Sequence, residues 1–192
     1  MCSNYWIRSK DTTQRLNKFL SRVIGAYQHG GIKGKKTQHI LSVLKELVMR
    51  GDRELRRLIL QMDLLAIMSI DVVKAYDSVV RAILWVLMER KYGMSRQVVK
   101  RFENIYKDPK IIAKVRGELT KEIEMEKALR QGDPLSPCLF ETYMNPPFKY
   151  VESKIQGLPL TNGTNLKALA FMDDGNFVVG KLEDLKQVSL GL

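Results

Sequence analysis

Apolar side chains recur every three or four residues in several stretches of this chain, which is the spacing of an amphipathic helix. The pattern predicts helices over residues 14–25, 38–50, 78–92, 95–106 and 182–190. A further helix is predicted to open at Pro134 and Pro137, because proline fits the first turn of a helix. Pro146 and Pro147 are then expected to kink or end that helix.

Other stretches have the shorter period of strands. An apolar run near residues 66–72 predicts a buried strand, and residues 110–126 alternate around a turn at Arg116–Gly117, which predicts a hairpin. A second hairpin is predicted at Asn162–Gly163, with Phe171 closing its return strand. This mixture predicts an α+β fold with mostly antiparallel pairing late in the chain.

One apolar stretch, LKALAFMDDGNFVVG (166–180), is interrupted by two carboxylates, Asp173 and Asp174. Burying an unpaired carboxylate is costly, so the pair is expected at a hairpin tip, where it is either solvated or holds a cation. Asp71 ends the other predicted buried strand, and three carboxylates from neighbouring strands would suit Mg²⁺. The alternatives are a solvated Asp-Asp turn and, for Asp71, a strand end or a helix cap.

Charge and cysteine content narrow the class of protein. The net charge is +11, and residues 1–57 carry thirteen Lys and Arg against four Asp and Glu. This surplus favours a polyanion as partner, either nucleic acid or an anionic membrane surface. Two cysteines exclude a disulfide framework, and the apolar region 58–73, broken by Asp63 and Asp71, is too short to span a bilayer. We expect an intracellular protein of the nucleus or cytoplasm, neither secreted nor bound to membrane.

Three motifs follow one another in the order and spacing of a known enzyme family. SIDVVKAYDSV (69–79), RQGDPLSPCLF (130–140) and AFMDDG (170–175) resemble the first catalytic motif, the substrate-positioning motif and the Asp-Asp hairpin of reverse transcriptases. The segment QHGGIKGKKTQHIL (28–41) is similar to the Gln-x-Gly region of the fingers of these enzymes. The style of the motifs is that of non-LTR retrotransposons, with group II intron enzymes as relatives.

The resemblance implies a fold and an activity. The fold would be a reverse-transcriptase palm, with an antiparallel sheet packed on helices, in residues 67–192, preceded by a partial fingers subdomain in residues 1–66. The thumb would be absent and, with the flanking domains, would be supplied by a longer parent protein. The activity would be RNA-directed DNA polymerisation, in which a dNTP is transferred to a DNA primer 3′-hydroxyl on an RNA template.

The resemblance also implies roles for individual residues. Two Mg²⁺ ions, with Mn²⁺ as a substitute, would be held by the catalytic residues Asp71, Asp173 and Asp174. The dNTP would be bound by Val72, Val73, Tyr76, Gln131 and Gly132. Nucleic acid would be contacted by Lys33, Lys35 and Lys36.

Some positions depart from the family pattern. The glycine-aromatic pair of the fingers is Gly30–Gly31 here, and Gly-Arg-Ser is Gly34–Lys35–Lys36. Lysine keeps the charge but loses bidentate phosphate recognition. Tyr76 would equally be expected as a core aromatic at the start of a helix. The alternative function is therefore a catalytically idle, nucleic-acid-binding remnant of a retroelement polymerase.

Overall fold

The computed structural model describes residues 3–30, 36–49, 66–107, 110–112, 114–124, 127–160 and 163–190. Its helical elements are α1 (Ser3–Val23), α2 (Thr37–Met49), α4 (Ala75–Ser78), α5 (Arg81–Val86), η1 (Leu87–Lys91), α6 (Arg96–Ile105), α7 (Ser136–Lys154) and α8 (Leu182–Leu190). Its strands are β1 (Ala66–Ile70), β2 (Lys110–Ile111), β3 (Lys114–Val115), β4 (Glu118–Leu119), β5 (Ile123–Glu124), β6 (Leu158–Pro159), β7 (Asn165–Leu166), β8 (Ala168–Phe171) and β9 (Asp174–Val179).

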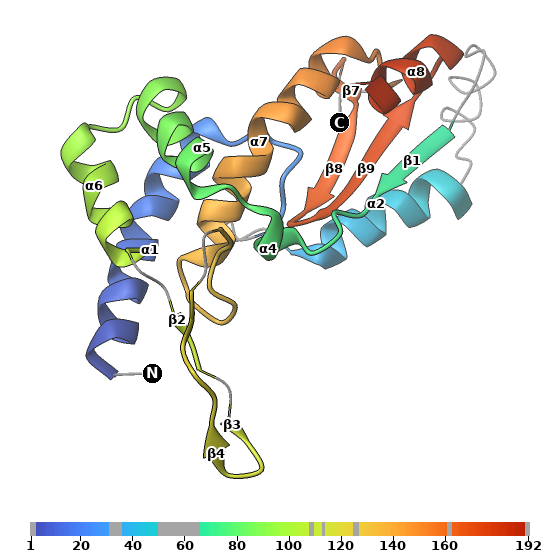
Figure 1. The fold of residues 1–192 in the computed structure, drawn as a ribbon. Helices are drawn as coiled ribbons and strands as arrows, with labels where there is room; N and C mark the ends of the chain where they lie inside the picture. Colours follow the sequence, from blue (N-terminus) through green and yellow to red (C-terminus); the bar gives the residue numbers. More distant parts are fainter. Residues whose placement is uncertain are drawn as a thin grey trace.

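The central sheet has three antiparallel strands in the order β1-β9-β8. Strand β9 pairs with β1 from Gly175 opposite Ile70 to Val179 opposite Ala66, and it pairs with β8 up to the Phe171–Asp174 pair. The end of β1 and the turn between β8 and β9 therefore lie at the same end of the sheet, where α4 follows (Figure 1). The predicted α+β architecture with antiparallel pairing is confirmed.

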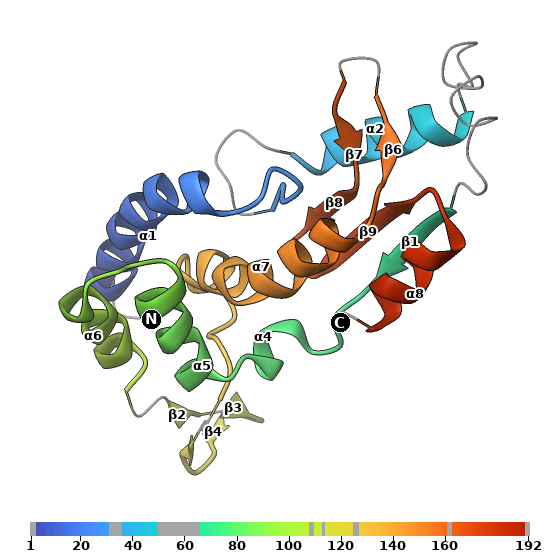
Figure 2. The same cartoon turned by 90° about the horizontal axis from the view of Figure 1, so that it is seen from above.

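One face of the sheet is covered by α7 and α8 (Figures 1 and 2). Alternate strand residues point to opposite faces, so Phe177 and Val179 share a face with Ala168 and Ala170. They form a buried cluster with side chains of α7, α8 and Tyr27: Phe148, Val151, Ile155 and Val188. This burial fixes the register, since a slip by one residue would turn the apolar face outward.

A second core lies between the helices. Helix α1 contacts the first half of α7, and α6 contacts η1. The fully buried side chains of this core include Val79, Leu84, Met88, Val99, Leu135 and Leu139. Leu16 and Leu20 of α1 belong to the same cluster, so the predicted fingers region and the predicted palm region share one core.

Of the two outcomes predicted at Pro146 and Pro147, a kink or an end of the helix, the end is wrong, because α7 continues through both prolines to Lys154. A proline at position 146 cannot donate to the carbonyl of Thr142 four residues earlier. That carbonyl instead accepts a hydrogen bond from the Tyr92 hydroxyl, at 3.0 Å. The tertiary bond offsets the missing helical one, and burial of Phe148 beyond the prolines favours continuation.

The predicted helix over residues 78–92 is wrong at its start, because the backbone is extended at Val79 and Val80. The backbone N–H of Ala128 donates to the Val79 carbonyl at 3.0 Å, and that of Leu129 donates to the Tyr76 carbonyl at 2.9 Å. These long-range bonds replace helical ones and separate α4 from α5. The other predicted helices and the hairpin at Arg116–Gly117 are present, although α1 begins earlier than predicted, at Ser3. Strands β6 and β7 pair where the second hairpin was predicted, but Asn162 of its turn lies outside the described residues, and Phe171 ends β8 rather than the return strand β7.

The hairpin formed by β2, β3, β4 and β5 turns at Arg116 and Gly117, as predicted, with φ of +51° and +93°. Figure 1 shows that it extends away from the helices. Across the described parts of the chain, no helix is both long and apolar enough to cross a membrane.

Candidate active site

Two of the three predicted catalytic carboxylates lie at the same end of the central sheet. Asp71 directly follows Ile70, which pairs with Gly175, and Asp174 directly precedes Gly175. Asp71 and Asp174 therefore flank the last pair of this register, one on each of two neighbouring chain segments. Both side chains are exposed. The strand pairing thus brings together two carboxylates that are far apart in the sequence.

The third carboxylate, Asp173, lies in the turn itself. The hairpin has a two-residue turn, Met172–Asp173, and Asp174 is already the first residue of β9. The turn was predicted one residue later, at Asp173–Asp174, so that detail is wrong. Met172 has a φ of +57°. Positive φ in a two-residue hairpin matches the twist of the flanking strands, so the turn geometry suits the sheet.

Gln28, for which no role was predicted from the sequence, holds this turn in place. Its Oε1 accepts hydrogen bonds from the backbone N–H groups of His29, Gly30 and Met172, at 3.0, 2.9 and 3.1 Å. Its Nε2 donates to the Met172 carbonyl at 3.4 Å. Gln28 also forms a parallel bridge with Ala170 of β8. The side chain is buried and therefore anchors the carboxylate turn to the N-terminal segment.

Gly30 allows this anchoring contact. A Cβ added at Gly30 would lie 2.6 Å from the backbone nitrogen of Met172, closer than real Cβ contacts come. Only glycine permits such a close approach of two backbone segments. The signal for both residues was present in the QHGG motif (28–31), but the sequence does not show that it lies against the Asp-Asp hairpin.

Three of the five predicted dNTP-binding residues line one cavity of about 560 Å³: Tyr76, Gln131 and Gly132. Asp133 and Ser136 complete its polar side. The other two predicted residues, Val72 and Val73, follow Asp71 directly, with Val72 half-buried and Val73 78% exposed.

Tyr76 joins the cavity to the carboxylates. Burial raises the pKa of Tyr76, and the negative charges of Asp173 and then Glu141 raise it further, so its hydroxyl lies within the electrostatic range of the turn. Its ring packs against Phe140, with centroids 5.4 Å apart. Tyr76 is therefore both a core aromatic and a cavity residue, and the two interpretations of this residue are compatible.

The loop at residues 130–135 is ordered mainly by Asp133. Its Oδ1 accepts hydrogen bonds from the Ser9 hydroxyl of α1 and from the Leu135 backbone N–H, and its carbonyl accepts one from the Ser136 N–H. Ser9 and Asp133 are both buried. The structure thus ties the N-terminal helix to the cavity loop, a contact that the sequence does not reveal.

Of the three lysines predicted to contact nucleic acid, one lies in the described part of the chain. Lys36 is exposed just before α2, whereas Lys33 and Lys35 lie outside the described residues.

Within the described part of the chain, no group of three or more His, Cys, Asp and Glu side chains is arranged to hold a metal ion. The three aspartates share one end of the sheet but do not form a closed coordination shell.

The family of the chain follows from comparison with known proteins. A family model described as "Reverse transcriptase (RNA-dependent DNA polymerase)" matches residues 1–189, and the chain belongs to this family. Among curated relatives, the "Transposon TX1 uncharacterized 149 kDa protein" of Xenopus laevis is 26% identical over 97% of this chain.

Two proteins of the retrotransposable element R2 are also similar, each over 56% of this chain. The type-1 R2 Pol polyprotein of Popillia japonica is 28% identical, and the type-2 R2DM polyprotein of Drosophila melanogaster is 32% identical. The chain spans 14% of the TX1 protein and 18% and 10% of the two R2 proteins. The predicted kinship with non-LTR retrotransposon proteins is confirmed.

A solved structure has the same fold. It is described as "Structure of apo telomerase from Candida Tropicalis truncated from C-terminal domain", and the match has a TM-score of 0.58 at 13% identity. The match covers 96% of this chain and 36% of the telomerase chain.

Proposed function

We propose that this chain is the partial fingers and palm of an RNA-directed DNA polymerase, which transfers a nucleotide from a dNTP to a primer 3′-hydroxyl on an RNA template. The observation that supports the proposal is the pairing of β1 with β9 up to Ile70 opposite Gly175, because Asp71 follows Ile70 and Asp174 precedes Gly175 at the same end of the sheet. A solvated surface turn would not require a second strand to end in a carboxylate at the same position.

The carboxylates suit the metal that this chemistry uses. Carboxylate oxygens are the ligands that Mg²⁺ prefers, and Asp71, Asp173 and Asp174 would hold two ions. Exposed side chains change rotamer within nanoseconds, so Asp71 and Asp174 can turn toward one another. When bound, the ions activate the primer 3′-hydroxyl and neutralise the charge of the triphosphate.

The cavity residues would bind and orient the nucleotide. Tyr76, between the cavity and Asp173, would contact the sugar and exclude a 2′-hydroxyl. The backbone at Val72 and Val73 would face the triphosphate, and Gln131 and Gly132 would contact the incoming base and its template partner. Gly132 has a φ of +82° and open space around it, which leaves room for a ligand.

The basic N-terminal part would bind the template–primer duplex. Phosphate contacts supply most of the affinity of such surfaces, and they weaken as salt rises. Lys33, Lys35 and Lys36 are the proposed contacts of this kind. The division into fingers, residues 1–66, and palm, residues 67–192, stays a prediction.

Primer extension on an RNA template, with Mg²⁺ and dNTPs, tests the proposal on the full chain. We expect the Asp173→Asn variant to lose about 100-fold or more in rate, as expected for removal of an electrostatic stabiliser. Asp77→Asn is the matched control, because Asp77 is an exposed carboxylate on α4 outside the proposed site, and its rate should be unchanged.

Thermal unfolding separates the proposal from its alternative. A metal that binds only the native chain raises its Tm. We expect Mg²⁺ or Mn²⁺ to raise the Tm of the parent chain and of Asp77→Asn, but not that of Asp173→Asn. A metal response without primer extension would favour the idle, nucleic-acid-binding remnant. Absence of both would contradict the metal site as well.

A further inference from the structure

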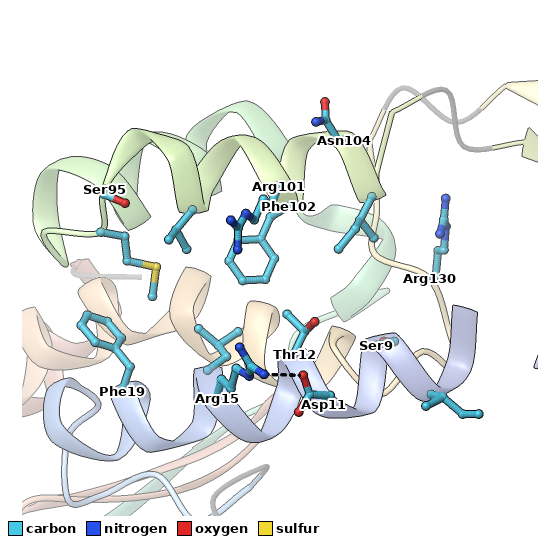
Figure 3. A pocket seen from close by; sticks show the side chains of 15 residues that line it. Ser9, Asp11, Thr12, Arg15, Phe19, Ser95, Arg101, Phe102, Asn104 and Arg130 are labelled. Atoms are coloured by element: carbon cyan, nitrogen blue, oxygen red, sulfur yellow. Dashed lines mark ion pairs between the residues drawn. The ribbon is translucent and has the colours of Figure 1, made fainter. Parts of the chain in front are cut away.

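Helices α1 and α6 face each other across an open groove of about 1290 Å³ that is separate from the nucleotide cavity. Figure 3 shows side chains of both helices projecting into the space between them. The apolar lining is supplied by Leu16, Phe19, Met94, Val98, Phe102 and Ile105. Val98 is 39% exposed and Ile7, at the open end, is 61% exposed.

The groove exists because the two helices pack on different partners. Helix α1 packs on α7 and α6 packs on η1, and α7 and η1 contact each other. The facing sides of α1 and α6 therefore form two walls above the helical core. Residues spaced by three or four, such as Val98, Phe102 and Ile105, line one wall in a row, which is the surface that accepts the side chains of another helix.

The rim of the groove is cationic. Its lining includes Arg15, Arg101 and Arg130. Among the described residues of the lining, Asp11 is the single carboxylate. Asp11 is paired with Arg15 at 3.1 Å, and both side chains are largely exposed. Arg130 lies over the ring of Tyr106, 5.2 Å from its centroid. The net positive rim would attract carboxylates.

We propose that this groove docks an amphipathic helix of a partner protein, apolar along one face and acidic along its flanks. Apolar anchors at helical spacing fit the floor, as in other helix-in-groove complexes. Acidic flanks complement the net positive charge that remains once Arg15 is paired with Asp11, which sets orientation and specificity. The proposal concerns binding alone and is independent of the polymerase reaction.

The observations favour a protein helix over the other polyanions that the charge of the chain could attract. Single-stranded nucleic acid needs successive exposed aromatic faces on which bases stack, and of the two aromatic side chains in the lining Phe102 is only 4% exposed and Phe19 is half-buried. A membrane surface is bound by protruding apolar residues, whereas these line a hollow between two helices.

A docked helix would lie against the elements that hold the nucleotide cavity. Ser9, which lines the groove, donates its hydroxyl hydrogen to Asp133. Arg130, also in the lining, directly precedes Gln131 of the cavity. The groove therefore offers a route by which a partner protein could steady the cavity loop.

Selection from a displayed library of helical peptides, with the exposed positions randomised and the full chain as bait, tests the proposal. We expect the selected helices to carry a continuous apolar face flanked by Asp and Glu. Their affinity should fall about 10-fold for Val98→Glu, which places a charge in the centre of the groove. Val86→Glu is the matched control, because Val86 is 51% exposed on α5 outside the groove, and it should leave the affinity unchanged.

A second pair of variants tests how much the arginines of the rim contribute to peptide affinity. Arg101→Gln should weaken the same peptides about threefold and flatten their salt dependence, as for a solvent-exposed ion pair. Arg22→Gln, an exposed α1 residue outside the lining, should do neither. A selection without binders, basic winners, or winners that bind Val98→Glu as tightly as the parent chain would overturn the proposal. Displacement of the helices by an RNA oligonucleotide or by anionic vesicles would overturn it as well.

Discussion

Two loops carry the candidate site, and the N-terminal segment holds each of them differently. The Met172–Asp173 turn is held by Gln28, whose amide bonds the backbone N–H and the carbonyl of Met172. The loop before α7 is held by Ser9, whose hydroxyl bonds the side chain of Asp133. Both anchoring side chains are buried.

The difference predicts different stiffness for the two loops. Gln28 satisfies main-chain groups at a point where Gly30 lets two backbones touch, so the carboxylate turn has little freedom to move. The cavity loop is joined to α1 by a bond between the Ser9 and Asp133 side chains, its other bonds through Asp133 are local, and it contains Gly132, which has open space around it. A polymerase site gains from fixed metal ligands and from a nucleotide loop that adapts to each base pair.

Among the variants that weaken these two anchors, Gly30→Ala should cause the largest loss of stability. Its Cβ would meet the backbone nitrogen of Met172 at 2.6 Å, so a backbone segment has to move. We expect a loss of about 3 kcal/mol in the free energy of unfolding, measured by urea denaturation, since overpacking costs this much where backbone must shift.

The control for Gly30→Ala is Gly163→Ala. Gly163 has a φ of +78° and open space around it, so alanine there meets only the left-handed backbone penalty of about 1 kcal/mol. Equal losses for the two variants would show that the approach of Gly30 to Met172 contributes nothing.

Gln28→Ala should have the next largest effect. It leaves the buried N–H of Gly30 and the partly buried N–H of Met172 without their partner, which costs about 2 kcal/mol. Gln38→Ala is the matched control, because Gln38 is exposed on α2, so its loss should be smaller. Urea denaturation of both variants measures this order, and the reverse order would contradict the proposed anchoring.

The local elements of the fold could be predicted from the sequence, and its long-range corrections could not. The strand before Asp71 and the hairpin at Arg116–Gly117 follow from local periodicity and turn residues. The passage of α7 through Pro146 depends on the hydroxyl of Tyr92, and the break at Val79 depends on the N–H of Ala128. No local pattern encodes such partners.

Some residues of the candidate site could likewise be predicted from the sequence, and others could not. Asp71, Asp173 and Asp174 could be named because their motifs resemble those of a family, and the strand register then explains why they share one end of the sheet. Gln28 and Ser9 act on residues more than a hundred positions away. Glutamine and serine are common at exposed positions too, so only the packed structure reveals their contacts.

The smallest of the three effects is expected when the Ser9 anchor is removed. The alkylation rate of the Cys138 thiol can measure it, because this thiol lies between α1 and α7. Cys138 is buried on α7 and donates to Oδ1 of Asn17 on α1, at 3.0 Å. Burial, and then the charge of Glu141, raise its pKa to about 12. The native thiol is thus almost fully protonated at pH 8, and its alkylation requires α1 to move away from α7.

Ser9→Ala should make that opening more frequent. Loss of the bond to Asp133 lowers the opening free energy by about 1 kcal/mol, which corresponds to about fivefold faster alkylation. The measurement uses the Cys2→Ser background, in which Cys138 is the remaining cysteine of the sequence. Ser21→Ala is the matched control, because the Ser21 hydroxyl bonds only within α1, to the Lys18 carbonyl.

The pH dependence of the alkylation rate has a definite sign. The native pKa of Cys138 lies above the value of about 8.5 for an exposed thiol, so the native state keeps a proton that the open state loses. Opening therefore becomes easier as pH rises from about 8.5 toward 12. Ser9→Ala should shift this curve upward at every pH, whereas Gln28→Ala, which loosens the other loop, should leave it in place. A shift with Gln28→Ala as large as that with Ser9→Ala would mean that the two loops open together and that their anchors are not independent.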